Sequence, residues 1–311
     1  AWVNGGLLPD AVRGGTVTAL IHMADWFATV CGLANVDPHD ETAVAAGLPA
    51  MDSLDQWPVL STPAGKSIRL MFRNNRISTH DVNRGAIPFK DQVLAFNHDH
   101  MLQLVKHILG SSQFEVDGLI PSSTVIPAEN LDLVKLENVL RLYMAESSTS
   151  TSLYQHWLAA REAGRDVLKY AGHELKIAEL EPNGRLPYLM DTPSTKEAVD
   201  RTIDADFLVE NGICTEEQYA QIRNSSLMAF GIVSQNLAQR GMILVDTKTE
   251  HGINAEGNIV AADELYTMDS SRFWALDDDG KVQTRDGKPV SFSKEFALRR
   301  GVRPASLQGI C

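Results

Sequence analysis

The sequence is poor in cysteine and in long apolar runs, and each shortage excludes a class of protein. Its 311 residues include only Cys31, Cys214 and Cys311. Three widely spaced thiols form neither a disulfide framework nor a metal-binding pattern, so a reducing, cytoplasmic setting is predicted. No apolar run approaches the roughly 20 residues that span a bilayer, so no membrane partner is expected.

The sequence also has too little positive charge to bind nucleic acid or an anionic membrane surface in general. Its formal net charge is −12, whereas such partners need a basic surface. Any anion must therefore be held by a local cluster of lysines and arginines. The glycine patterns of Rossmann folds and P-loops are missing too. What remains, with 44% hydrophobic residues, is a globular chain with enough apolar side chains for a sizeable core.

The order of predicted elements favours an α+β fold. Apolar residues at helical spacing predict helices over 21–33, 97–109 and 216–240, and alternation predicts a strand over 67–72. Gly110 and Gly241 follow the last two helices, where glycine commonly ends a helix. Strands that alternate irregularly with long helices, followed by a late hairpin, suit α+β better than a doubly wound sheet.

The most informative segment is a predicted hairpin rich in charge. Gly241-Met-Ile-Leu-Val245 indicates a buried strand, and alternation then places Asp246, Lys248 and Glu250 on one face. A turn over 254–258 leads to a return strand over 259–262, which delivers Asp263 and Glu264. Carboxylates from adjacent strands suit Mg²⁺, and a lysine between them suits a phosphate. A solvated face with cross-strand ion pairs is the alternative, and it stays open.

Other segments carry candidate anion donors, each with a plainer interpretation. Asp269-Ser-Ser-Arg272 has the composition of a phosphate clamp, or of a turn with a surface arginine. Arg141, with the hydroxylated run 147–152, suits sugar and phosphate oxygens, although that run also resembles a linker. In Thr192-Pro-Ser-Thr-Lys196 the hydroxyls and the lysine suit an anion, or simply cap a helix. His98 and His100 on a helix are expected to be ordinary helix histidines, because positions i and i+2 diverge.

The first 62 residues differ from the rest, and three motifs mark them. These are His22-Met-Ala-Asp-Trp-Phe-Ala-Thr29, Gly47-Leu-Pro49 and Asp52-Ser-Leu-Asp-Gln-Trp-Pro58. Together they resemble the late part of an arylsulfatase. The nucleophile signature of that family is missing, since Cys31 is followed by Gly-Leu-Ala-Asn. We therefore expect residues 1–62 to be an appendage, separated by a loop from a second domain over 65–311.

Several blocks in the remaining sequence occur in a characteristic order. They are Arg76-Ile-Ser-Thr-His-Asp81, Ile87-Pro-Phe-Lys-Asp-Gln-Val-Leu94, the Arg141 segment with its hydroxyl run, Leu186-Pro-Tyr188 with Thr192-Pro-Ser-Thr-Lys196, Asp246-Thr-Lys-Thr-Glu250, and Asp263-Glu264 with Asp269-Ser-Ser-Arg-Phe-Trp274. Over residues 65–311 the chain thus resembles the phosphoribosylaminoimidazole-succinocarboxamide synthase (SAICAR synthetase) family. The resemblance implies an α+β ATP-binding fold related to the ATP-grasp folds.

The resemblance also implies a reaction and its participants. A ligase would use ATP and Mg²⁺ to join L-aspartate to 5-aminoimidazole-4-carboxylate ribonucleotide in purine biosynthesis, and no nucleic acid would take part. The residue types fit, because phosphoryl transfer between two anions needs cations to offset their repulsion. The matching positions are Lys248, Glu250, Asp263 and Asp269 for catalysis, Glu250 and Asp263 for the metal, and Arg141, Ser147, Arg272, Lys196 and Thr195 for substrate.

The start of the domain departs from the family pattern. The family opens with a glycine- and lysine-containing strand and loop over the ATP phosphates, whereas here Gly65-Lys66 alone precede the strand. The nucleotide lid is therefore expected to be incomplete. Two alternatives follow: a catalytically inactive fusion or gene-model chimera, and a sulfatase-related hydrolase, which the missing nucleophile disfavours. Oligomeric state leaves no signature in the sequence.

Overall fold

A computed structural model describes residues 3, 5–15, 25–39, 42, 45, 53, 55–61, 68–72, 76–79, 82–113, 125–196 and 201–292. The chain divides into two compact units. The first comprises Ala1–Asn74, Ser112–Leu131 and Asn254–Glu256. The second comprises Asn75–Ser111, Asp132–Ile253 and Gly257–Cys311, and it carries every candidate site residue.

Among its described residues, the first unit contains three short helical elements and one strand pair. Its elements are η1 (Asp10–Val12), α1 (Asp25–Leu33), α3 (Trp57–Ser61), β1 (Ile68–Phe72) and β4 (Val125–Glu129). β1 and β4 pair antiparallel, with Ile68 opposite Glu129. The predicted helix over 21–33 is thus found from Asp25 onward, and residues 21–24 lie outside the described residues. The strand predicted over 67–72 is confirmed as β1.

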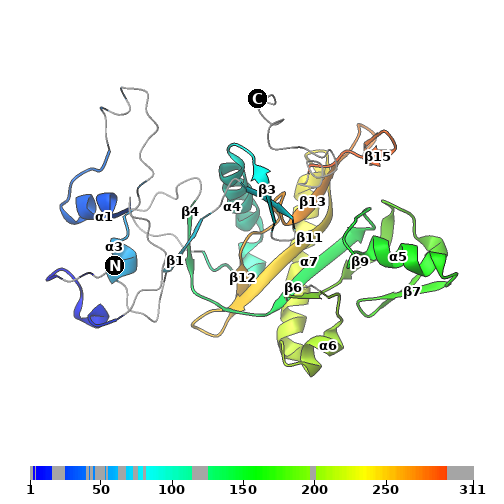
Figure 1. Cartoon of the computed structure of the whole chain (residues 1–311), viewed down its shortest axis with the longest axis horizontal. Helices are drawn as coiled ribbons and strands as arrows, with labels where there is room; N and C mark the ends of the chain where they lie inside the picture. The colour runs from blue at the N-terminus through cyan, green and yellow to red at the C-terminus, as the bar shows by residue number, and fades with distance from the viewer. Residues whose placement is uncertain are drawn as a thin grey trace. The chain divides into compact units, whose positions relative to one another are not determined.

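The second unit is built on a seven-stranded sheet in which every pairing is antiparallel. The long strand β11 (Met242–Ile253) lies at its centre, next to β6 (Leu136–Tyr143), as Figure 1 shows. β5 pairs with the same edge of β11 as β6 does, whereas β12 and β13 pair with the opposite edge of β11. β9 and β10 pair with the edge of β6 that faces away from β11. Their bounds are β5 (Asp132–Leu133), β9 (Arg185–Asp191), β10 (Ser194–Thr195), β12 (Ile259–Ala262) and β13 (Ser271–Ala275).

Two helices, α4 (Lys90–Leu109) and α7 (Glu216–Ala238), cover one face of this sheet and form the main core with it (Figure 1). A capping box between Thr215 and Gln218 starts α7, because each side chain binds the other residue's backbone N–H. Buried residues from both helices and from the sheet make up the core: Met101, Leu102, Val105, Leu109, Leu140, Ala229, Phe230, Val233, Leu237, Leu244, Ala261, Leu265, Tyr266 and Phe273.

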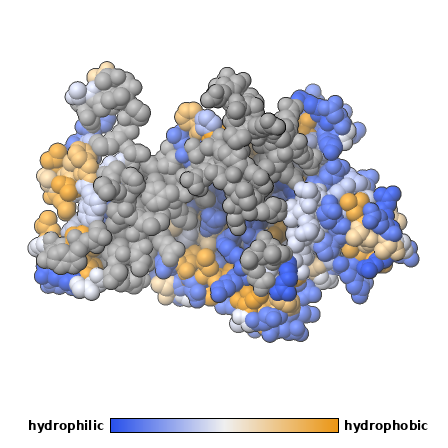
Figure 2. Space-filling model, in the orientation of Figure 1, coloured by the Kyte–Doolittle hydropathy of each residue, from blue (hydrophilic) through white to orange (hydrophobic). Residues whose placement is uncertain are grey.

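Smaller elements surround this core. A second cluster of buried residues packs α5 (Leu153–Glu162) against the hairpin of β7 (Val167–Tyr170) and β8 (His173–Lys176). The remaining elements are β2 (Arg76–Thr79), β3 (Val82–Ala86), η3 (Ile177–Glu179), α6 (Ala205–Glu210), β14 (Thr284–Arg285) and β15 (Lys288–Pro289). On the face shown in Figure 2, mainly hydrophilic residues, with smaller apolar patches among them, cover the part around α5 and β7. None of the described helices combines the length and apolar character needed to cross a lipid bilayer.

The hairpin predicted over 241–262 is confirmed, but β11 contains a β-bulge that simple alternation does not reveal. The pairing of β11 with β13 shifts between Leu244 and Asp246. Leu244 packs into the helix-covered core, whereas Val245 packs with Trp274 in a separate cluster. A bulge lets two consecutive residues oppose one on the partner strand and re-aims the side chains that follow. It therefore turns Asp246 away from the face that buries Leu244.

Candidate functional site

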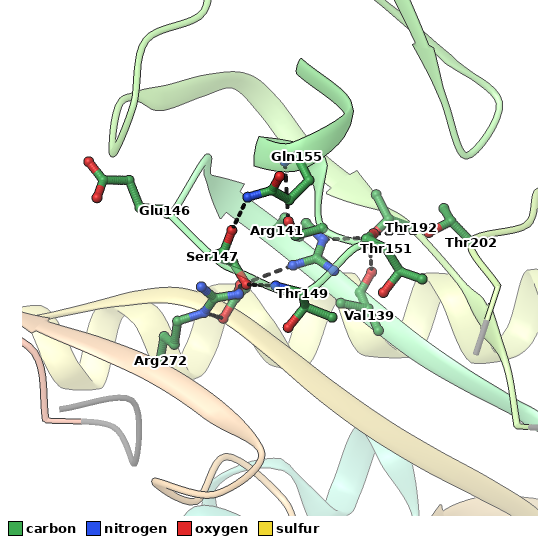
Figure 3. Close-up of polar contacts among 12 residues, drawn as sticks. Val139, Arg141, Glu146, Ser147, Thr149, Thr151, Gln155, Thr192, Thr202 and Arg272 are labelled. Atoms are coloured by element: carbon green, nitrogen blue, oxygen red, sulfur yellow. Dashed lines mark hydrogen bonds and ion pairs between the residues drawn. The ribbon is translucent and has the colours of Figure 1, made fainter. Parts of the chain in front are cut away.

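Two arginines from strands on either side of β11 share one carboxylate. In the strand register Asp246 lies opposite Arg141 of β6 and opposite Arg272 of β13. Arg141 Nη1 donates to Asp246 Oδ2 over 3.2 Å, and Arg272 donates through Nε over 3.0 Å, with its Nη2 2.8 Å from Oδ2. Figure 3 shows the guanidinium groups of Arg141 and Arg272 close to each other, each with dashed lines that mark its polar contacts. With two cations around one anion, the group keeps a net positive charge that suits a phosphate.

A second ionic cluster follows two residues further along β11. Lys248 Nζ donates to Glu137 Oε1 over 2.6 Å and to Glu250 Oε1 over 3.1 Å, and the second oxygen of Glu250 binds Lys196. The Glu250 side chain is only 11% exposed, whereas Lys248 is 36% exposed. These four side chains place two ammonium groups beside two carboxylates. The predicted placement of Lys248 and Glu250 on one face is therefore present in the structure, and Lys196, predicted separately as a substrate residue, binds the same Glu250.

The ionisation of this cluster is set by its partners. Burial alone would lower the pKa of Lys248, but the charges and hydrogen bonds of Glu137 and Glu250 outweigh it and raise that pKa. Burial would raise the pKa of Glu250, but hydrogen bonding to Lys196 and the charge of Lys248 hold it below its usual range. At neutral pH Lys248 is thus an ammonium and Glu250 a carboxylate. Lys248 is suited to stabilise negative charge rather than to act as a base.

The two remaining predicted catalytic acids lie near the ends of β12 and β13. Asp263 directly follows β12 and has a left-handed backbone, with φ of 55°. Asp269 precedes β13 and forms an ion pair with Lys90, the first residue of α4. The structure thus joins Asp269 to the Lys90 segment, which sequence analysis identified only as one block of the family resemblance.

The predicted substrate residues Ser147 and Thr195 have local hydrogen-bonding roles. Ser147, in the loop after β6, accepts a hydrogen bond from the backbone N–H of Thr149, while its carbonyl accepts from Gln155 (Figure 3). Thr195 is 2% exposed, and its hydroxyl accepts from the backbone N–H of Arg201. The hydroxylated run is therefore not a linker between domains, since Ser152 at its end caps α5.

Sequence reasoning missed Glu137 as a partner of Lys248. The burial of β6 alternates, so Glu137, Val139 and Arg141 share the less buried face. The sequence does not show this alternation clearly, because the buried Asn138 is polar and the less buried Val139 is apolar, so only the spacing of Glu137 and Arg141 by four residues hinted that they share a face. His98 behaves as expected for a core histidine, since it is 1% exposed and its Nδ1 accepts from the backbone N–H of Leu265.

The described residues contain no group of three or more histidine, cysteine, aspartate or glutamate side chains arranged to hold a metal ion. Glu250 and Asp263 are both carboxylates, which are hard oxygen ligands. Across the strands, however, Glu250 pairs with Ala262 rather than with Asp263, and its two oxygens bind Lys248 and Lys196. A Mg²⁺ ion that accompanies a nucleotide needs only one or two carboxylates, with phosphate and water completing its shell. The residue types therefore suit such an ion, but the strand register alone does not place the two carboxylates on one face.

Comparison with known proteins places these residues in one family. Residues 61–304 match the model of the family described as SAICAR synthetase. A chloroplastic phosphoribosylaminoimidazole-succinocarboxamide synthase from Arabidopsis thaliana is 32% identical, over 82% of this chain and 60% of its own length. The synthase from Legionella pneumophila strain Lens is 31% identical, over 73% of this chain and 69% of its own length.

Solved structures show the same fold. The SAICAR-synthase from Saccharomyces cerevisiae, complexed with SAICAR, aligns with a TM-score of 0.61 at 21% identity, over 78% of this chain and 80% of that one. A type-2 SAICAR synthetase in complex with ADP aligns with a TM-score of 0.56 at 21% identity, over 76% and 86% of the two chains. At these identities the likeness concerns the fold alone.

The N-terminal resemblance fares differently. The family model, the relatives and the solved structures described above are all SAICAR synthetases, so the arylsulfatase resemblance of residues 1–62 is not borne out. The chain spans 60% of the Arabidopsis relative's length and about 70% of the bacterial ones. The family match, by contrast, covers most of the chain, including every candidate site residue. The chain belongs to the SAICAR synthetase family.

Proposed function

We propose that the chain is an ATP-dependent carbon–nitrogen ligase that joins L-aspartate to 5-aminoimidazole-4-carboxylate ribonucleotide. The products would be SAICAR, ADP and phosphate, as in purine biosynthesis. The observation that carries the proposal is the family match over residues 61–304, within which Lys248, Arg141 and Arg272 gather around the charged face of β11. The relatives' names and the ADP and SAICAR complexes support the same substrates.

The chemistry requires an oxygen of the ribonucleotide carboxylate to become a leaving group. Attack of that oxygen on the γ-phosphorus of ATP forms an acyl phosphate and releases ADP. The aspartate amine then attacks the acyl carbon, the C–O bond to phosphate breaks, and the amine loses a proton as the amide forms. The first step brings two anions together, so it depends on cations that are already in place.

Lys248 is the residue best placed for that electrostatic role. An ammonium has three N–H donors, and Glu137 and Glu250 accept two of the hydrogen bonds described for it. The third donor would bind the transferring phosphoryl group or the substrate carboxylate. Because its two acidic partners keep Lys248 charged, it needs no change of protonation during the transfer.

Arg141 and Arg272 would bind the phosphate of the ribonucleotide, assisted by Ser147. Their guanidinium groups are planar and are held by Asp246. Such a group can bind two phosphate oxygens at once, whereas a lysine ammonium would act as a mobile point charge. Lys196, Thr195 and Asp269 are proposed as further substrate or catalytic residues by family resemblance. Glu250 and Asp263 would hold Mg²⁺, which when bound would neutralise charge on the nucleotide phosphates.

Several finer features remain proposals. These are the relation to ATP-grasp folds, the incomplete nucleotide lid, the division into 1–62 and 65–311, and a cytoplasmic location. Residues 62–67, where the lid prediction falls, lie outside the described residues. The names of two plant relatives include the word chloroplastic, so the compartment differs among relatives. An inactive fusion and a sulfatase-related hydrolase are both less well supported than the ligase.

The test is ADP formation that depends jointly on ATP, the carboxylated ribonucleotide and L-aspartate. Lys248→Ala should lower kcat by at least about 100-fold, because it removes a charge aimed at the developing phosphoryl anion. Lys169→Ala is the matched control, since Lys169 forms an exposed ion pair with Glu174, and an exposed pair contributes little. Its kcat should equal that of the unmodified protein.

Three outcomes would contradict the proposal or its mechanism. An unmodified protein that forms no ADP with all three substrates would favour the inactive fusion. Hydrolysis of an aryl sulfate without ADP formation would favour the hydrolase. An active enzyme in which Lys248→Ala keeps near-normal kcat would leave the ligase standing but remove Lys248 from its mechanism.

A further inference from the structure

A buried aspartate at the end of β9 is held by donors from two other elements. Arg223 Nε and the Tyr219 hydroxyl, both from α7, donate to Asp191 Oδ2 over 2.7 and 2.9 Å. His173, the first residue of β8, places Nε2 2.8 Å from the Asp191 carbonyl oxygen and 3.5 Å from Oδ1. Asp191 is 8% exposed. A buried carboxylate is costly unless it is paired in this way, so the cluster fixes the end of β9 firmly.

The cluster keeps this carboxylate charged. Burial alone would raise the pKa of Asp191, but the hydrogen bonds from His173, Arg223 and Tyr219 outweigh it and hold that pKa far below its usual range. Hydrogen bonding to Asp191 in turn raises the pKa of His173, although burial opposes the rise. The aspartate therefore remains a charged anchor at any pH at which the protein would work.

The next residue, Thr192, links this anchor to the arginine pair. Its hydroxyl donates to the carbonyl oxygen of Val139 over 3.1 Å and accepts from Arg141 Nε over 3.1 Å (Figure 3). Its backbone N–H also donates to Val139, over 2.7 Å. Thr192 is 1% exposed. Arg141 is thus held at two points, by Thr192 at Nε and by Asp246 at Nη1.

We propose that Asp191 and Thr192 are positioning residues for ribonucleotide binding. Asp191 anchors the end of β9, and the Thr192 hydroxyl then sets the plane of the Arg141 guanidinium beside Arg272. This inference rests on the proposed function, since it assigns the arginine pair to the ribonucleotide. A planar donor that is fixed before binding loses less conformational freedom when it binds, so its positioning contributes directly to affinity.

A purely structural role for the cluster predicts a different result. Asp191 joins α7 and the β7–β8 hairpin to the sheet, so its loss could simply destabilise the second unit. Destabilisation lowers the amount of active protein and leaves the KM of the remainder unchanged. A positioning role instead raises KM for the ribonucleotide and spares KM for ATP, because Arg141 is proposed to contact the ribonucleotide.

The experiment compares Thr192→Val, Thr192→Ser and Asp191→Asn in the 311-residue chain. Thr192→Val removes the hydroxyl at nearly constant volume and should raise the ribonucleotide KM about tenfold, with the KM for ATP unchanged. Thr192→Ser keeps the hydroxyl and should restore the original value. Asp191→Asn should shift the same KM in the same direction. Thr202→Val is the control, because its hydroxyl binds the Thr151 carbonyl rather than an arginine.

The outcomes separate this inference from the proposed function. An unmodified protein without substrate-dependent ADP formation would overturn both. An active unmodified protein whose Thr192→Val variant keeps its ribonucleotide KM would overturn the positioning role alone. An equal rise in both KM values, or a rise that Thr192→Ser shares, would do the same. If Asp191→Asn fails to fold, the comparison of Thr192→Val with Thr192→Ser still tests the positioning role.

Discussion

At the scale of single residues, His251 is a neutral side chain in a place that excludes charge. It is 1% exposed on β11, directly after Glu250, and neither ring nitrogen has a hydrogen-bond partner among the described residues. Burial lowers the pKa of His251 to about 4, although the charge of Glu250 opposes the shift. The unfolded chain exposes the same imidazole to water, where its pKa is 6.5. This difference makes the stability of the fold depend on pH.

The direction of that dependence follows from which state binds the proton first. Above pH 6.5 the imidazole is neutral in both states, and His251 adds no pH dependence. As the pH falls from 6.5 toward 4, the unfolded chain takes up the proton and is favoured. We expect the unfolding free energy to drop by about 3 kcal/mol over this range from His251 alone. Denaturant unfolding at a series of pH values measures it.

Two variants separate titration from burial at this position. His251→Leu should flatten the fall between pH 6.5 and 4, and should also add about 1 kcal/mol at pH 7 by removing an unpartnered polar group. His251→Gln should flatten the pH dependence without that gain. A variant that retains the full acid loss would show that the loss comes from other groups.

At the scale of secondary-structure elements, Gly110 decides how α4 ends. It follows Leu109 with φ of 62° and ψ of −179°, a conformation that essentially only glycine adopts. A Cβ there would also lie 2.9 Å from Cγ1 of Val260 on β12. Gly110→Ala should therefore lower the unfolding free energy by about 2–4 kcal/mol, from backbone strain plus the clash. Denaturant unfolding at neutral pH measures this loss.

Other glycines provide matched controls for that substitution. Gly212 also has positive φ, of 64°, but a Cβ there would meet nothing within 4 Å, so Gly212→Ala should show strain alone, about 1 kcal/mol. Gly231 lies within α7 with open space around it, and Gly231→Ala should stabilise by about 0.5–1 kcal/mol. Equal effects at Gly110 and Gly212 would show that the contact with Val260 relaxes freely.

The same elements show what the sequence could and could not predict. The hairpin and α7 were found because their turn, cap and stop residues are local signals. The first two turns of α4 were missed, since Val93 and Phe96 are exposed and interrupt the apolar stripe. The bulge in β11 was also missed, because it arises from pairing with β13 rather than from local composition.

For the site, alternation correctly grouped Asp246, Lys248 and Glu250, and resemblance added the arginines. The ionic partner of each of these side chains, however, depends on the strand register. The register sets Asp246 between Arg141 and Arg272, and it brings Glu137 of β6 to Lys248. Asp191 and its donors come from β8, β9 and α7, which are distant in sequence and carry no common motif. Such tertiary clusters are beyond single-sequence reasoning.

At the scale of the whole molecule, the chain carries a segment ahead of its family region. The family match begins at residue 61, and α1 lies before it. Three hydrogen bonds connect α1 to Ser53 and Gln56. The backbone N–H of Ala28 donates to Ser53, that of Gln56 donates to Thr29, and the Gln56 amide donates to Asp25. These contacts join α1 to a stretch that also lies ahead of the family match, which supports the proposal that residues 1–62 form an appendage.

Removal of residues 1–62 tests that proposal directly. The truncated protein keeps every residue proposed to bind ATP, the ribonucleotide or aspartate, and it keeps the core of α4, α7 and the sheet. We therefore expect its kcat and all three KM values to remain within about twofold of those of the full chain, since the ionic clusters on β11 are unchanged. Steady-state ADP formation by both proteins measures this.

A selective rise in the KM for ATP would instead assign the appendage to the nucleotide site, where it would replace the incomplete lid. A loss of folded protein, seen by circular dichroism, would show that the second unit depends on the segment for stability, and the division at 62–65 would then be wrong.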